Sequence, residues 1–96
     1  MTEVRWTPQA ADDLQAIYDF IGRDSPHYAQ VIVEDLLAAI DRLEQFPLMG
    51  RHVPERLRED LRELIKPPYR VVYQVGEVIL ILTIFRASRL FPTGVL

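Results

Sequence analysis

The sequence predicts one α+β domain, in which a helical hairpin packs on one face of a mainly antiparallel sheet. Three observations indicate this class: an alternating segment at the N-terminus, two successive amphipathic helical segments, and three strand-like segments in the second half. The expected order is therefore β-α-α-β-β-β. Because domains commonly contain ~100–150 residues, the 96 residues are expected to form a single domain over 1–96.

The first strand and both helices are predicted from residue types at fixed positions. Residues 1–6 alternate polar and apolar side chains, which is typical of a short strand. Residues 7–8 and 25–26 each place a hydroxyl residue before a proline, and this pair is typical of a helix start. Apolar stripes at helical spacing follow both pairs. The second helix is expected to continue to about Phe46 and to stop before Pro47.

The second half predicts a loop followed by three strands. Leu48 to Asp60 is rich in proline, glycine and arginine and is expected to be a loop. The strands are expected at 61–66, 69–75 and 78–85. Between the last two strands, Gly76 followed by glutamate predicts a two-residue hairpin of type II′.

The last predicted strand is apolar on both of its faces, from Val78 to Phe85. Such a strand is usually central and covered on both sides. The helical hairpin can cover only one face of the sheet. The other face is therefore expected to be covered by the C-terminal tail, with Leu90 and Phe91, or by a protein partner.

Composition excludes several classes of function. The absence of cysteine excludes disulfides, thiolate zinc sites and a cysteine nucleophile, and it fits a reducing cytoplasm, the expected location. No apolar run reaches the ~18 residues of a membrane span, and no signal peptide is expected. His27 and His52 lack partners at metal-ligand spacing, and there is no glycine-rich phosphate loop. We therefore expect no metal, no cofactor and no membrane contact. Paired acids such as Asp12 and Asp13 are expected to lie on a solvated helix surface.

Charge is distributed unevenly along the chain. Residues 1–48 carry three arginines and nine acids, a net charge of −6, whereas residues 49–96 carry eight cations and five acids, a net charge of +3. Ten of the eleven cations are arginines, whose planar fork of donors suits carboxylates and phosphates. A polarised surface with a basic side is expected, although an ordinary solvated surface would have the same composition.

The arginines of the second half are the candidate site residues. With a period of two, those on the strands are expected to converge on the sheet face opposite the helices. They could bind nucleic acid, stabilise a phosphoryl transition state, bind an acidic protein segment, or pair with acids such as Glu63. The candidates are Arg51 in the loop and, on or after the strands, Arg62, Arg70, Arg86 and Arg89.

The order of these motifs resembles the RelE/ParE superfamily of type II toxin–antitoxin toxins over most of the chain. The first strand and helix of the family resemble residues 4–7 and 10–21. Leu43, Pro47 and Gly50-Arg51 match its "L…P…GR" segment. Residues 62–64 and 69–73 match its "REL" and "YRvvY" strands.

The resemblance implies a toxin neutralised by a cognate antitoxin, in a possible toxin–antitoxin hetero-oligomer. RelE-like members cut mRNA on the ribosome, and ParE-like members poison DNA gyrase. In a nuclease, Arg70 and Arg86 would stabilise the scissile phosphate. However, Phe91-Pro92 stands where nucleases carry a tail tyrosine, and the net charge is −3. The resemblance therefore favours a ParE-like gyrase inhibitor, with residues 89–96 as the expected gyrase contact. A RelE-like endoribonuclease and a member that only binds a partner remain the alternatives.

Overall fold

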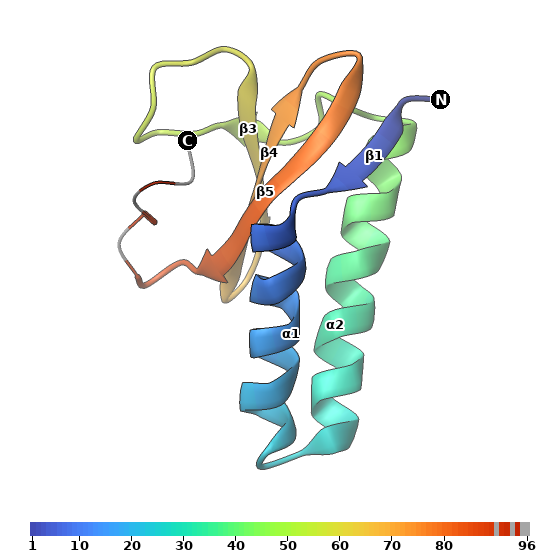
Figure 1. Ribbon diagram of the computed structural model, residues 1–96, viewed down its shortest axis with the longest axis vertical. Coiled ribbons are helices and arrows are strands. Elements are labelled where there is room, and N and C mark those ends of the chain that lie inside the picture. The colour runs from blue at the N-terminus through green and yellow to red at the C-terminus, as the bar shows by residue number, and fades with distance from the viewer. Residues whose placement is uncertain (90, 93, 95–96) are drawn as a thin grey trace.

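A helical hairpin packs against one face of a five-stranded sheet, and its far end extends beyond the sheet (Figure 1). The structure is a computed structural model that describes residues 1–89, 91–92 and 94. The sheet has the order β1-β5-β4-β3-β2. The elements are β1 (Glu3–Trp6), α1 (Pro8–Gly22), α2 (Pro26–Asp41), a 3-10 turn (Arg42–Glu44), β2 (Arg51–His52), β3 (Leu61–Lys66), β4 (Tyr69–Val75) and β5 (Val78–Arg86).

The predicted α+β class and the order of its elements are confirmed, with two additions. Strands β2 to β5 are antiparallel to their neighbours, whereas β1 joins β5 in parallel, with Trp6 beside Ile81. The segment expected to be a loop contains β2, which pairs Arg51 with Glu63 and His52 with Arg62. A strand of two residues is too short to show alternation, so the sequence pattern did not reveal it.

Both helices begin where the sequence predicted. The Thr7 side chain accepts a hydrogen bond from the Ala10 amide, and the Ser25 side chain accepts one from the Tyr28 amide. The second helix ends at Asp41 and continues only as a 3-10 turn, several residues before the expected end. Within the described ranges, no helix is long and apolar enough to cross a membrane.

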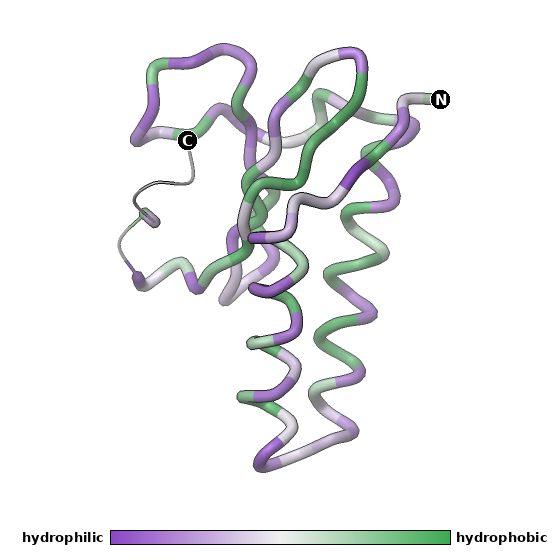
Figure 2. Tube along the Cα trace, viewed as in Figure 1, coloured by the Kyte–Doolittle hydropathy of each residue, from purple (hydrophilic) through white to green (hydrophobic). Residues whose placement is uncertain are grey.

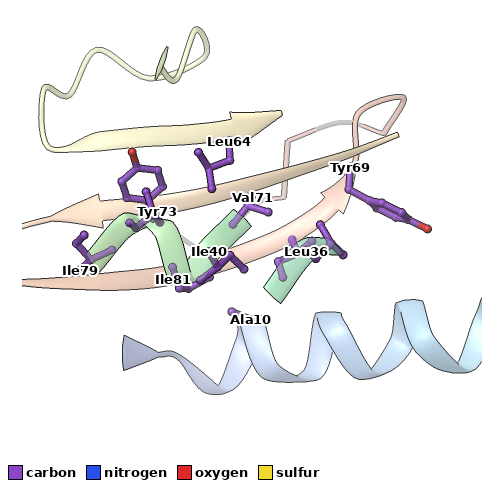
Figure 3. Packing of buried hydrophobic residues seen from close by; sticks show 11 residues of the cluster. Ala10, Leu36, Ile40, Leu64, Tyr69, Val71, Tyr73, Ile79 and Ile81 are labelled. Atoms are coloured by element: carbon purple, nitrogen blue, oxygen red, sulfur yellow. The ribbon is translucent and has the colours of Figure 1, made fainter. Parts of the chain in front are cut away.

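The main core lies between the helices and the sheet (Figure 3). Ala10 of α1 and Leu36 and Ile40 of α2 pack against Tyr73 of β4 and Ile81 of β5, and all five are fully buried or nearly so. Figure 2 shows the corresponding apolar colour along α2 and β5. A fully buried large aliphatic side chain contributes roughly 1.5–3 kcal/mol, so this cluster fixes the hairpin on the sheet.

The second face of the sheet is covered by the chain itself. Val53, from the loop after β2, and Phe91, from the tail, pack with Val72 of β4 and Phe85 of β5. The Phe85 and Phe91 rings meet edge to face, with centroids 5.6 Å apart. The expected cover by the tail is thus seen at Phe91, and the loop adds a cover that was not expected. Leu90, the other tail residue named for this role, lies outside the described residues.

Strand β5 carries an extra residue that adjusts which side chains face the helices. Val72 lies opposite Thr83, but the next residue of β4, Tyr73, lies opposite Ile81, so Leu82 is a bulge. Ile81 and Ile84 consequently both join the core under the helices.

The β4–β5 hairpin is confirmed, but its predicted type II′ turn is wrong. A type II′ turn requires a positive φ at Gly76, and the φ of Gly76 is not positive.

Gly50 marks a close approach between the loop and the sheet. The Tyr73 hydroxyl accepts a hydrogen bond from the Gly50 amide and donates one to the Pro47 carbonyl, both at 2.9 Å. Burial raises the pKa of the Tyr73 hydroxyl, so it stays protonated as a donor. A Cβ on Gly50 would lie 2.6 Å from this hydroxyl and 2.6 Å from the Glu63 carbonyl oxygen.

Gly50→Ala is therefore expected to lower the free energy of unfolding by about 2 kcal/mol, because the methyl group overpacks a buried site and displaces the hydroxyl. Gly76→Ala is the matched control, since a Cβ there would meet its nearest atom at an ordinary 3.5 Å. Urea unfolding of the two variants measures the difference. Equal stability of both variants would contradict the close packing at Gly50.

Candidate functional site

A buried carboxylate lies at the centre of the sheet face that points away from the helices. Glu63 of β3 is 1% exposed, and its cross-strand neighbour Val72 belongs to the second apolar cluster. Two arginines reach the carboxylate: Arg51 Nε lies 2.6 Å from Oε2, and Arg70 Nε lies 2.7 Å from Oε1. These contacts compensate the large cost of taking a carboxylate out of water.

The same Arg70 side chain is held on its other edge by Glu55. Arg70 Nη1 and Nη2 each lie 2.8 Å from one oxygen of the Glu55 carboxylate, which is the bidentate geometry of a strong charge-assisted pair. The Arg70 guanidinium also lies 5.0 Å from the centroid of Phe85 and 5.6 Å from that of Phe91. Arg70 is only 7% exposed. We call Arg51, Glu55, Glu63 and Arg70 the arginine–glutamate cluster.

The loop between β2 and β3 places Glu55 over the sheet because it is fastened at both ends. At its start, Val53 is buried, and its carbonyl accepts a hydrogen bond from the Arg56 amide. At its end, the Asp60 carbonyl accepts one from the Val75 amide at 2.7 Å, and the Asp60 side chain accepts one from Gln74. Glu55 thus reaches Arg70 from a loop anchored to β4.

The positive and negative charges of the arginine–glutamate cluster are equal in number. Two cations face two carboxylates, so the cluster has no net charge to attract a phosphate. The hydrogen bonds from Arg70 lower the pKa of Glu55 to about 2, and those with Glu55 and Glu63 raise the pKa of Arg70. Glu55 is therefore ionised and weakly basic near neutral pH, which makes it a poor general base. Chemically, the arrangement is suited to fixing the loop on the sheet.

The expected convergence of the strand arginines on one face is wrong for Arg62. This residue lies opposite Tyr73, whose ring is in the core under the helices, so Arg62 points to the helix side of the sheet. Its Nη1 donates to the carbonyls of Leu48 and Gly50, at 3.1 and 2.8 Å. Arg62 thus stabilises the loop before β2.

Arg86 and Arg89 also lie away from Arg70. Arg86 ends β5 opposite Tyr69, which belongs to the helix-side core, and its guanidinium lies 5.9 Å from the centroid of the Tyr69 ring. Arg89 follows in the turn, where its amide donates to the Arg86 carbonyl. Both line a groove beside α1. The five candidates therefore do not form one site: the Glu63 carboxylate joins Arg51 and Arg70, Arg86 and Arg89 line the groove, and Arg62 bonds to the loop before β2.

Sequence reasoning named Glu63 as a possible partner of these arginines, and the structure confirms that pairing. It missed Glu55, and it misplaced Asp13. The Asp13 carboxylate is half-buried and accepts hydrogen bonds from Thr83 Oγ1 at 2.6 Å and from the Ile84 amide at 3.0 Å. The expected solvated pair with Asp12 is thus wrong for Asp13. No local signal could have shown this, since the partners lie 70 residues away. His27 and His52 are exposed, as expected.

Comparison with known proteins places this fold and sequence in a family. Residues 4–91 match the family described as "ParE toxin of type II toxin-antitoxin system, parDE". The chain belongs to the RelE/ParE superfamily of toxins. It is 40% identical to Toxin RelE2 of Caulobacter vibrioides over 94% of this chain and all of the relative. It is 33% identical to putative toxin Y4kP of Sinorhizobium fredii, over 93% and 92% of the two chains.

Solved structures agree with this assignment. A chain from the chromosomal ParDE toxin–antitoxin system of P. aeruginosa superposes with a TM-score of 0.76 at 32% identity, over 92% of this chain and 98% of the other. A chain of the toxin–antitoxin complex RelBE2 of Mycobacterium tuberculosis shares the fold, with a TM-score of 0.56 at 24% identity, over 88% and 96%. The protein is a toxin of a type II toxin–antitoxin system, as its sequence motifs predicted.

Arg70→Ala is expected to lower the free energy of unfolding by about 3–5 kcal/mol, because it leaves Glu63 buried with only one partner. Arg58→Ala is the matched control. Its guanidinium pairs with Asp60 at 2.8 Å at the surface, where water and salt screen the two charges, so its removal should change stability little. Urea unfolding at neutral pH compares the two variants. A similar, small loss in both would show that Arg70 has no structural role.

Proposed function

We propose that this toxin acts as a ParE-like inhibitor of DNA gyrase rather than as a nuclease, and that a cognate antitoxin neutralises it. The observation that carries this proposal is that the Arg70 side chain is buried and paired with carboxylates. A RelE-like mechanism needs this arginine at the scissile phosphate, yet its guanidinium is buried and is engaged by the carboxylates of Glu55 and Glu63. A binding protein needs no free arginine at this position.

The arginine–glutamate cluster is unfavourable for phosphoryl chemistry for two reasons. A phosphate approaching Arg70 would meet two carboxylates, and their repulsion would offset the attraction of the guanidinium. In addition, Glu55 has a pKa of about 2, far from the value near the working pH that general acid–base catalysis requires. Both features support a role for the cluster in folding and a function based on binding.

The family match also supports a ParE-like function. The family description names a ParE toxin, and the structural neighbour at 32% identity comes from a ParDE system. This neighbour belongs to a toxin–antitoxin system, which supports a cognate antitoxin as the partner of this chain and a toxin–antitoxin hetero-oligomer. The tail from Arg89 onward is our proposed gyrase contact; of it, residues 90, 93, 95 and 96 lie outside the described part of the chain.

A ribosome-dependent endoribonuclease is the second candidate, and one observation favours it. The relative at 40% identity is named Toxin RelE2, and this chain presents exposed arginines, among them Arg51, Arg86 and Arg89, that could contact RNA. In that role, the exposed arginines would grip the RNA, while Arg70 would first have to leave Glu55. Toxicity of Arg70→Ala does not separate the candidates, because this substitution also weakens the fold.

The candidates differ in which synthesis stops first. After induction of this chain alone in bacteria, pulse-labelling is expected to show DNA synthesis falling before RNA and protein synthesis, with DNA damage signalling. The purified chain is also expected to inhibit supercoiling of a relaxed plasmid by gyrase, and added antitoxin should relieve the inhibition. If protein synthesis falls first and cleaved mRNA accumulates, the nuclease candidate replaces the gyrase inhibitor. Unimpaired growth would remove both.

A further inference from the structure

The loop between β2 and β3 presents one leucine entirely to solvent. Figure 1 shows this loop projecting from the sheet, away from both helices. Leu57 is fully exposed, whereas Val53 near the start of the same loop is buried. An exposed leucine keeps apolar surface in water, and covering that surface with another molecule is favourable. Isolated exposed apolar residues are common on protein surfaces, so exposure alone assigns no role to Leu57.

The chain on the N-terminal side of Leu57 is held in one position. Both carboxylate oxygens of Glu55 lie 2.8 Å from the Arg70 guanidinium nitrogens. The Arg56 guanidinium lies 4.6 Å from the centroid of the Phe91 ring, and its Nη1 donates to the Glu55 carbonyl at 3.0 Å. The two residues before Leu57 are therefore fastened to the sheet and to the tail.

The chain on the C-terminal side of Leu57 is held as well. Arg58 donates two hydrogen bonds to the Asp60 carboxylate, at 3.1 and 2.8 Å. Gln74 donates to the same carboxylate, and the Val75 amide donates to the Asp60 carbonyl. A loop held on both sides of Leu57 loses little conformational entropy when a partner binds, which is the advantage of preorganisation.

The charges of the loop favour a protein partner over a nucleic acid. Residues 55–60 contain two arginines and three acids, a net charge of −1. Nucleic acids are bound through rows of cations that follow the phosphate backbone, and the loop has no such row. An apolar side chain on a rigid loop instead fits an apolar pocket on a protein surface.

We propose that Leu57 is a contact residue for the protein target of this toxin and inserts into an apolar pocket of that target. The inference rests on the proposed inhibition of DNA gyrase and names a residue through which it occurs. Because Arg56 contacts Phe91, the loop and the tail form one continuous surface, and the tail is the proposed gyrase contact. The arginine–glutamate cluster then has a consequence for function, since it holds the loop that presents Leu57.

The test measures how much purified full-length chain is needed to halve the supercoiling of a relaxed plasmid by gyrase. Leu57→Ser is expected to raise this concentration at least about tenfold, because the apolar contact is lost. Leu57→Met keeps an apolar side chain of similar volume and should inhibit like the unaltered chain. Leu48→Ser is the matched control, since it removes another exposed leucine from the segment before β2. Urea unfolding should show equal stability for all variants, because both leucines are exposed.

Loss of inhibition in Leu57→Ser alone supports the proposal. Full inhibition by Leu57→Ser overturns it and leaves the gyrase function intact. An equal loss in Leu57→Ser and Leu48→Ser also overturns it, because the effect is then not specific to the loop. If Leu57→Met fails as badly as Leu57→Ser, the contact is not apolar and the proposal is wrong. If the unaltered chain does not inhibit gyrase, the proposed function fails and the role of Leu57 fails with it.

Discussion

The buried carboxylate of Glu63 is the constraint on which the loop, the sheet and the state of Arg70 depend. A charge in that position is tolerated only if cations accompany it, and they come from two different strands, as Arg51 of β2 and Arg70 of β4. Arg70 in turn requires Glu55, which fixes the loop over the sheet. Consecutive ion pairs from Arg51 to Glu63, Arg70 and Glu55 thus connect strand β2, the loop and the central strands.

This constraint also separates two surfaces with different properties. On the face away from the helices, Arg51 and Arg70 are paired with carboxylates of the chain itself, and Arg70 is also held against aromatic rings. On the side of α1, Arg23, Arg86 and Arg89 face solvent without a carboxylate among the described residues, next to apolar side chains of α1. The first arrangement stabilises the fold and holds the loop, whereas the second leaves its cations open to solvent. In the proposed function, the toxin therefore acts through binding surfaces.

The fold was largely predictable from the sequence, because its signals are local. Each helix start is marked by a cap residue followed by proline. The strands from Leu61 onward are marked by a residue pattern that spans only a few positions. The candidate site was predictable as a set of arginines with Glu63 as one possible partner. The sheet face to which each arginine points depends on the cross-strand register. This register places Arg62 and Arg86 opposite tyrosines of the helix-side core. Glu55, the second partner of Arg70, comes from a loop without periodicity, and Asp13 accepts a hydrogen bond from a strand residue 70 positions away.

The most direct measurement of the central claim is the exchange of the arginine Nε–H protons with water, by NMR of the 15N-labelled protein with and without a short single-stranded RNA. If Arg70 is held by Glu55 and Glu63, its Nε–H exchanges much more slowly than that of the exposed Arg89, and its resonance does not move when RNA is added. If the Nε–H of Arg70 exchanges as fast as that of Arg89 and shifts with RNA, the arginine is free for phosphate chemistry. In that case the structural role of Arg70 and the gyrase proposal built on it are both contradicted.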